Sequence, residues 1–132
     1  MHIGVPREIK KLETRVACTP SAVRHLVSGG HRVMVQCGAG LDSGFSDDKY
    51  RRAGAVMTES SEEVWQSELV VKVKEPLEEE FRHFRSDLIL FTFLHLAGNP
   101  SLLQALLDSG VTAIAYETVQ DNGRLPLLAP MS

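Results

Sequence analysis

The sequence predicts an α/β fold in which an open parallel sheet is covered by helices on both faces. Three observations support this. Segments with strand signals alternate with segments with helix signals along the chain. The segment "LILFTF" at 88–93 is apolar without interruption, as strands buried on both faces are. The length of 132 residues suits one domain with its own core.

The first three elements are predicted from local signals. "HIGV" at 2–5 is a short run with β propensity. The segment "TPSAVRHLVSGG" at 19–30 predicts a helix, since it opens with a capping Thr19 followed by proline and closes with two glycines. "HRVMVQC" at 31–37 alternates between apolar and polar residues as a strand does.

The next elements repeat this order. "SDDKYRRAG" at 46–54 begins with a serine suited to cap a helix, has acids in its first turn and ends in glycine. "AVMT" at 55–58 predicts a short strand. "SSEEVWQ" at 60–66 predicts a helix that begins with a capping box of Ser60 and Glu63.

The segment "LVVKVKEP" at 69–76 predicts a strand that carries two lysines. Side chains alternate across a strand, so Lys72 and Lys74 point to one face and Val71 and Val73 to the other. One face of this strand is therefore expected to become cationic towards its end.

The last elements complete the alternation. "EPLEEEFRHFR" at 75–85 has apolar residues at helical spacing, and "NPSLLQALLDSG" at 99–110 predicts a helix capped by Asn99. "TAIAYETV" at 112–119 predicts a further strand. The closing "QDNGRLPLLAPMS" holds an Asn-Gly turn signal and no helix to end it, so we expect the chain to be a fragment.

Composition narrows the class of protein. The formal net charge of −3 provides no basic field for nucleic acid. No apolar run approaches the ~20 residues of a membrane span, and "MHIGVPREIKK" lacks the order of a signal peptide, so we expect a cytoplasmic protein. Cys18 and Cys37 follow no metal-ligand spacing and are expected to be small buried thiols. We predict no metal site.

Cationic residues fall where predicted strands end. Ligands of open parallel sheets bind outside the carboxyl ends of the strands. Lys74 ends one strand, His95 follows the next, Glu117 lies near the end of a third, and Arg15 follows the first. Arginine offers a bidentate fork, lysine a point charge and histidine a proton near neutral pH, which together suit a small carboxylate substrate.

Each of these residues also has a structural interpretation. Lys74 could be a solvated edge charge, His95 a core histidine between two leucines, and Arg15 a surface residue of a loop. Lys72 is either a second ligand or the partner of an acid such as Glu75, and we favour the second interpretation.

Other patterns are weaker. "GAG" at 38–40 follows a strand but lacks the third glycine of a dinucleotide fingerprint, so it predicts a turn. Trp65 is expected in the core, and "EEE" at 78–80 is expected on a solvated helix face.

Several long motifs resemble one family. They are "GVPREIKKLETRVACTP", "GHRVMVQCGAG", "VVKVKEPL", "LFTFLHLA", "IAYETVQ" and "LPLLAPMS". Together they resemble the amino-terminal part of the alanine dehydrogenase/nicotinamide nucleotide transhydrogenase family over 1–132. The resemblance implies a doubly wound, flavodoxin-like three-layer substrate domain. It also implies that an NAD-binding Rossmann domain, missing from this chain, follows, and that the protein assembles as a homo-oligomer, typically a hexamer.

The resemblance to NAD-dependent alanine dehydrogenase implies reversible oxidative deamination of L-alanine to pyruvate and ammonia. Arg15 and Lys74 would hold the substrate, and His95 would hydrogen-bond the reacting centre and move a proton. Met131 and Ser132 match the segment that approaches the nicotinamide. NAD itself would be bound mainly by the following domain, so the 132-residue chain alone is expected to be inactive.

Two alternatives remain at this point. The alpha subunit of proton-translocating transhydrogenase shares the domain, but its pattern lacks the counterparts of Lys74 and His95. A stand-alone ligand-binding or oligomerisation module without catalysis is the other. Many dehydrogenases carry tyrosine where this chain has Phe93, which bears on substrate preference.

Overall fold

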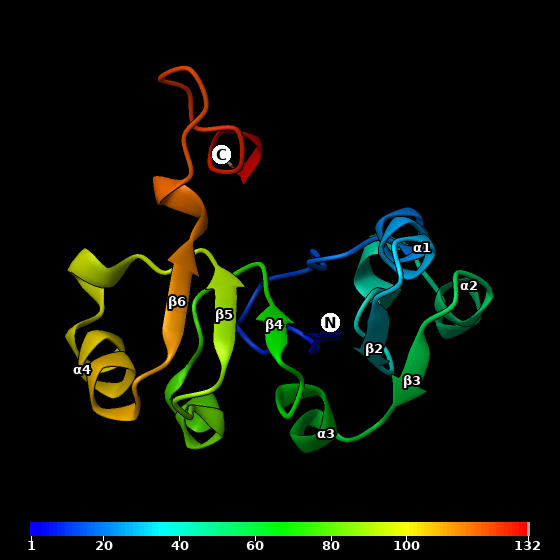
Figure 1. Ribbon diagram of the computed structural model, residues 1–132, viewed down its shortest axis with the longest axis horizontal. Coiled ribbons are helices and arrows are strands. Elements are labelled where there is room, and N and C mark those ends of the chain that lie inside the picture. The colour runs from blue at the N-terminus through cyan, green and yellow to red at the C-terminus, as the bar shows by residue number, and fades with distance from the viewer. Residues whose placement is uncertain (132) are drawn as a thin grey trace.

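Six parallel strands form one open sheet in the order β3-β2-β1-β4-β5-β6, seen in a computed structural model that describes residues 1–131 (Figure 1). The strands are β1 His2–Val5, β2 Arg32–Gln36, β3 Val56–Thr58, β4 Leu69–Val71, β5 Ile89–Thr92 and β6 Thr112–Ala115. The predicted doubly wound α/β sheet is confirmed. Five strands, β2-β1-β4-β5-β6, follow the flavodoxin-like order, and β3 adds a sixth at the edge beside β2.

Four α-helices and several short 3-10 turns connect the strands. The helices are α1 Pro20–Ser28, α2 Asp47–Arg52, α3 Ser61–Trp65 and α4 Pro100–Ser109. The 3-10 turns are η1 Leu41–Ser43, η2 Glu78–His83, η3 Leu96–Gly98, η4 Tyr116–Thr118 and η5 Ala129–Met131. Within residues 1–131 no helix has the length and apolar character needed to cross a membrane.

The core has two parts, one for each group of helices. Strands β1 and β2 supply Val5 and Val35 to the first part, which packs against Val23 of α1 and Tyr50 of α2. The Tyr50 hydroxyl donates to the Cys18 carbonyl at 2.7 Å, and burial raises the pKa of Tyr50 to about 12. This bond ties the loop after β1 to α2.

The second part of the core contains Trp65, whose predicted burial is confirmed at 1% exposure. Val70 of β4 and Leu90 of β5 pack with it, as do Leu102 and Leu106 of α4. Within β5, Leu90 and Thr92 are buried, whereas Ile89 and Phe91 are only partly buried, so the predicted burial of this run on both faces is incomplete.

Three predicted helix caps form and one does not. The Ser46 hydroxyl accepts from the Lys49 amide at the start of α2. The Thr19 hydroxyl accepts from the Ala22 amide at the start of α1. The Ser60 hydroxyl accepts from the Glu63 amide at the start of α3, but the reciprocal bond of the predicted capping box does not form, because the Ser60 amide donates to the Thr58 hydroxyl. The prediction that Asn99 caps α4 was wrong, because its side-chain amide donates instead to the His95 carbonyl at 3.0 Å.

Three further predictions need correction around the lysine segment. Strand β4 ends at Val71, not at Pro76, although Lys72 still donates to the Phe91 carbonyl. The helix expected over 75–85 is instead the shorter 3-10 turn η2, which begins after Pro76. Proline disfavours a helical backbone in the residue before it, so a helix could not begin at Glu75. Glu80 of the expected solvated face is buried, with 5% exposure.

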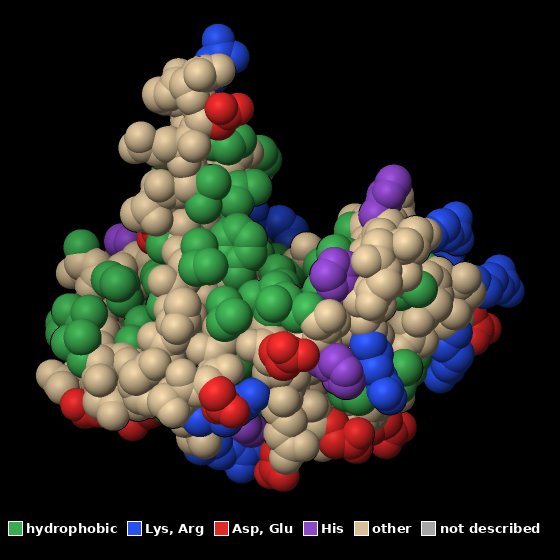
Figure 2. Space-filling view, viewed as in Figure 1, with side chains coloured by type: hydrophobic (Ala, Val, Ile, Leu, Met, Phe, Trp, Pro, Cys, Tyr) green, Lys and Arg blue, Asp and Glu red, His purple; other side chains and the backbone are tan. Residues whose placement is uncertain are grey.

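One face of the sheet is covered only in part. Leu69 and Val71 of β4 pack against the core under α1 and α2. Their neighbours in register, Phe91 of β5 and Ile114 of β6, are only partly covered, and Ile114 is 42% exposed. In Figure 2 hydrophobic side chains gather over the β4 and β5 region of this face. Among the described residues no helix covers this half.

Candidate functional site

The carboxyl ends of the six strands meet at one rim of the sheet, and the segment after β6 lies beyond this rim (Figure 1). Arg15 lies in the loop after β1, Lys74 three residues past β4 and His95 three residues past β5. Met131 ends η5, while Ser132 lies outside the described residues. The parallel topology therefore puts the predicted residues at the same rim.

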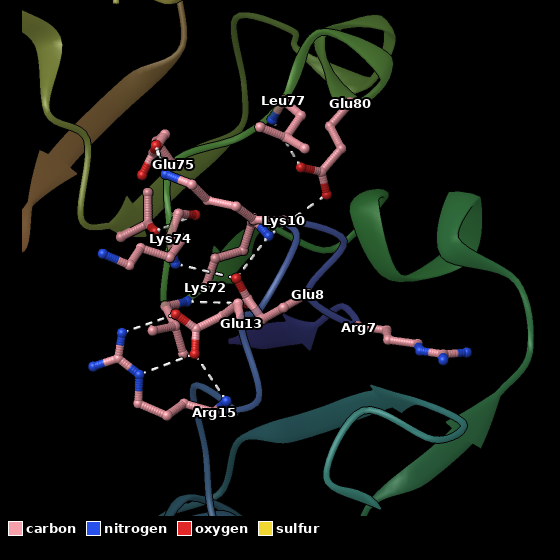
Figure 3. A network of polar contacts seen from close by, with 12 residues as sticks. Arg7, Glu8, Lys10, Glu13, Arg15, Lys72, Lys74, Glu75, Leu77 and Glu80 are labelled. Carbon is pink, nitrogen blue, oxygen red and sulfur yellow. Dashed lines mark hydrogen bonds and ion pairs between the residues drawn. The ribbon is translucent and has the colours of Figure 1, made fainter. Parts of the chain in front are cut away.

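Lys72 is buried between two carboxylates. Its ammonium nitrogen lies 3.1 Å from Glu8 and 3.6 Å from Glu80, with the lysine side chain 1% exposed (Figure 3). The predicted partner Glu75 was wrong, since Glu75 pairs with Lys10. The preferred interpretation of Lys72 as an ion-pair partner is consistent with this burial, because a buried ammonium group needs carboxylates beside it.

Glu8 also fixes the backbone that carries Lys74. Its carboxylate accepts hydrogen bonds from the amides of Val73 and Lys74 at 3.0 and 3.1 Å. On the other side, the Thr92 hydroxyl donates to the Lys74 carbonyl at 3.0 Å. The Lys74 side chain is half-buried, and its ammonium nitrogen lies 4.8 Å from the centre of the Phe93 ring. Lys74 is thus held by its main chain while its charge stays available.

Glu13 holds the guanidinium of Arg15. The Nε and Nη2 atoms of Arg15 donate to the two Glu13 oxygens at 2.9 and 2.8 Å. These bonds lower the pKa of Glu13 and raise that of Arg15. Nη1 points elsewhere and donates to the Met131 carbonyl at 3.4 Å. The edge formed by Nη1 and Nη2 can therefore still receive a carboxylate, as a guanidinium has five donors.

His95 is exposed, so its interpretation as a core histidine was wrong. Its backbone is left-handed, with φ 48° and ψ 49°. Its ring stacks with Phe93, the ring centres 5.8 Å apart and the planes 14° apart. The Glu117 carboxylate accepts from the amides of Leu94 and His95 at 3.1 and 2.7 Å.

These contacts bring the candidates into one chain of neighbours. Glu13 pairs with Arg15, and Lys74 comes from the neighbouring segment after β4 (Figure 3). Phe93 contacts both Lys74 and His95. The rim thus presents an arginine edge, an ammonium group and an imidazole in sequence, a set that can bind a small carboxylate and move a proton.

A cavity of about 430 Å³ opens beside this chain. Arg15 and Met131 line it, together with Val73, Phe45 and Tyr116. Lys74 and His95 are not part of its wall. A second hollow of about 500 Å³, lined by Arg7, Gln36 and Trp65 among others, contains none of the predicted site residues.

The glycine turn at 38–40 does not fit the phosphates of a dinucleotide. The amide of Gly38, which a phosphate would need, donates to the Asp47 carboxylate at 2.9 Å. Gly40 packs against Tyr50, where a Cβ atom would lie 2.6 Å from the ring. The predicted turn at 38–40 is confirmed, and it leaves no anion cradle.

Sequence reasoning missed the carboxylates that hold these cations. Glu8 and Glu13 stand in the quoted run "VPREIKKLETR", and Glu117 was noted only as lying near a strand end. Their alternation with Arg and Lys was the available signal. Which acid meets which cation depends on contacts up to 66 residues apart, as between Glu8 and Lys74.

Fold and rim together define a class: an open α/β domain that presents cationic side chains and a histidine at the carboxyl ends of its strands. The family model described as "Alanine dehydrogenase/PNT, N-terminal domain" matches residues 4–132. The chain belongs to this family.

Relatives agree with this assignment. The chain is 59% identical to an alanine dehydrogenase of Bacillus subtilis and 53% identical to one of Staphylococcus epidermidis. All of the chain aligns, but it covers only 35% and 36% of those proteins, so it spans about a third of their length.

Solved structures give the same result. An L-alanine dehydrogenase superposes with a TM-score of 0.96 at 50% identity, over 99% of this chain and 37% of that one. A transhydrogenase from Sinorhizobium meliloti superposes with a TM-score of 0.83 at 29% identity, over 89% of this chain and 35% of that one. The chain is thus more similar to the dehydrogenase.

Proposed function

We propose that this chain is the substrate domain of an NAD-dependent alanine dehydrogenase, which interconverts L-alanine with pyruvate and ammonia. The observation that carries the proposal is the contact of both Lys74 and His95 with the Phe93 ring, at the rim where the loop of Arg15 also lies. The transhydrogenase-like alternative has less support, since that relative is less similar.

Each residue has a separate task in this proposal. The Nη1–Nη2 edge of Arg15 receives the substrate carboxylate through the remaining N–H groups of these atoms, and the Lys74 ammonium group binds a neighbouring substrate oxygen. His95 lies at the carbon that changes oxidation state, where its imidazole donates or accepts the proton. The nicotinamide, when bound, accepts a hydride from that carbon.

In this proposal the dinucleotide is held mainly by a further domain, since the chain spans about a third of its relatives' length and its glycine turn at 38–40 does not fit a dinucleotide. In this proposal Met131 and Ser132 lead towards the nicotinamide, and the carbonyl contact from Met131 to Arg15 joins that segment to the substrate site. The half-covered sheet face at Phe91 and Ile114 supports burial against further protein, which agrees with a homo-oligomeric cytoplasmic enzyme.

An NMR titration of the 132-residue chain with pyruvate tests the proposal. Pyruvate is expected to shift amides around Arg15, Lys74 and His95, whereas methyl pyruvate, which lacks the carboxylate charge, is expected not to. Binding will be weak, because only part of the site is present. Equal shifts with both compounds, or none with either, would contradict the proposal and favour a non-catalytic module.

A further inference from the structure

A single carboxylate holds two consecutive amides at the end of β5. One oxygen of Glu117 accepts from the Leu94 amide at 3.1 Å, and the other accepts from the His95 amide at 2.7 Å. Glu117 reaches them from η4, 22 residues further along the chain from His95. The bond therefore joins the ends of two neighbouring strands.

His95, whose amide Glu117 binds, has a left-handed backbone. A residue with a Cβ atom rarely adopts φ 48° and ψ 49° unless its surroundings enforce it. The His95 carbonyl accepts from the side chain of Asn99 and from the amide of Gly98, at 3.0 and 3.1 Å. Those bonds hold the carbonyl, and Glu117 holds the amide.

The element that carries Glu117 is itself anchored. Tyr116, the residue before it, packs edge-on against Phe91 of β5, with ring centres 4.7 Å apart. Burial raises the pKa of Tyr116. Glu117 therefore comes from an anchored element, whereas the His95 that it binds lies in an exposed loop. The position of Glu117 can thus determine that of the loop.

We propose that Glu117 is a positioning residue that fixes His95 for the reaction by binding the amides of Leu94 and His95. This rests on the proposed function of His95. Glu117 acts through the backbone and needs no contact with the substrate, which distinguishes it from Lys74.

A double-mutant cycle on the 132-residue chain tests the proposal, with pyruvate as the probe. The Glu117→Gln change keeps the shape of the side chain but replaces one acceptor oxygen by an NH₂ group that faces a donor. We expect Glu117→Gln to weaken pyruvate binding about tenfold, since bonds to a charged acceptor are the stronger ones. In a His95→Ala background the same change should weaken binding no further.

Amide exchange gives a readout that is independent of binding. In Glu117→Gln the amides of Leu94 and His95 should exchange faster, while that of Leu90 within β5 should not. Glu78→Gln, at an exposed carboxylate of η2, is the matched control and should change neither property.

The outcomes separate this inference from the proposed function. Full additivity of Glu117→Gln and His95→Ala, or unchanged exchange at both amides, overturns the positioning role. If the amides respond as expected but the unsubstituted chain binds no pyruvate, the backbone role of Glu117 stands, and the proposed function with its substrate role for His95 fails.

Discussion

The Lys74 ammonium nitrogen lies 4.8 Å from the centre of the Phe93 ring, and the same ring stacks with that of His95. One apolar side chain thus contacts two of the three candidate residues of the rim. A ring face attracts a cation through its quadrupole, and a stacked ring restricts the rotation of its neighbour. Phe93 orders Lys74 and His95 without adding a polar group.

Replacing this ring gives a first prediction. Phe93→Leu removes a cation–π contact worth about 0.5–1 kcal/mol, which corresponds to roughly a twofold to fivefold loss of affinity. We expect pyruvate binding to the chain to weaken by that factor, measured by NMR titration. Phe93→Tyr retains the ring and is the control. Equal losses in both variants would mean that the ring does not act through these contacts.

Lys74→Met should abolish most alanine turnover in a full-length dehydrogenase carrying this domain. Methionine matches the length of the lysine stem but lacks its charge. Loss of a desolvated charged partner costs about 2–5 kcal/mol, roughly a thirtyfold to several-thousandfold effect on kcat/KM. A solvated edge lysine would cost almost nothing. Near-normal kcat/KM in the variant would remove Lys74 from the substrate site.

Lys72→Met is expected to affect stability first. The ammonium group is buried against Glu8 and Glu80, and its removal leaves two carboxylates without their cation. Breaking a buried pair costs about 3–5 kcal/mol, which urea denaturation of the chain would detect. Because Glu8 also binds the Lys74 amide, this variant is a poor activity control for Lys74→Met. A change below about 0.5 kcal/mol would show that the burial is not maintained in solution.

The sequence predicted the secondary structure correctly where the local signals and the burial of a segment favour the same element. The order of strands and helices followed from caps, glycines and apolar runs, because these act within a few residues. The signals failed where tertiary contacts compete. Asn99 has the residue type of a cap, yet its amide serves the His95 carbonyl. Glu80 belongs to an acidic run, yet burial beside Lys72 raises its pKa, with the desolvation only partly offset by the lysine.

The candidate site was predicted by residue type and position but not by its connections. Parallel strands put Arg15, Lys74 and His95 at one rim, and that much follows from topology. The left-handed backbone of His95 has no signature in "FLHLA", since glycine or asparagine would be expected there. The carboxylate that binds the His95 amide, Glu117, comes from a different strand end.

Glu13→Gln should change how stability depends on pH. The Arg15 bonds lower the pKa of Glu13 below its usual 4.5, so the folded state binds this proton more weakly than the unfolded state does. Its stabilising contribution is therefore complete above pH 4.5 and is lost as the pH falls through the lowered pKa. We expect the free energy of unfolding of the two proteins to differ most at about pH 6 and to converge in acid. A difference that grows on acidification would contradict this.

Gly98→Ala separates the position of His95 from the stability of the fold. A Cβ atom at Gly98 would lie 2.5 Å from Nε2 of His95. The ring is exposed and can swing away, so the free energy of unfolding should change by less than about 1 kcal/mol, as is usual for surface positions. The displaced ring must leave Phe93, and NMR should therefore show new His95 ring shifts together with weaker pyruvate binding.

Gly29→Ala is the matched control, because a Cβ atom there would lie no closer than 3.4 Å to its neighbours and the backbone φ is −80°. It should leave both the His95 ring shifts and pyruvate binding unchanged. If Gly98→Ala moved the ring yet left binding unchanged, His95 would not contact the ligand. If it unfolded the chain, the His95 loop would contribute more to stability than its exposure indicates. We expect Gly98→Ala to retain its stability and lose pyruvate binding, because the orientation of the His95 ring, and not its packing, serves the site.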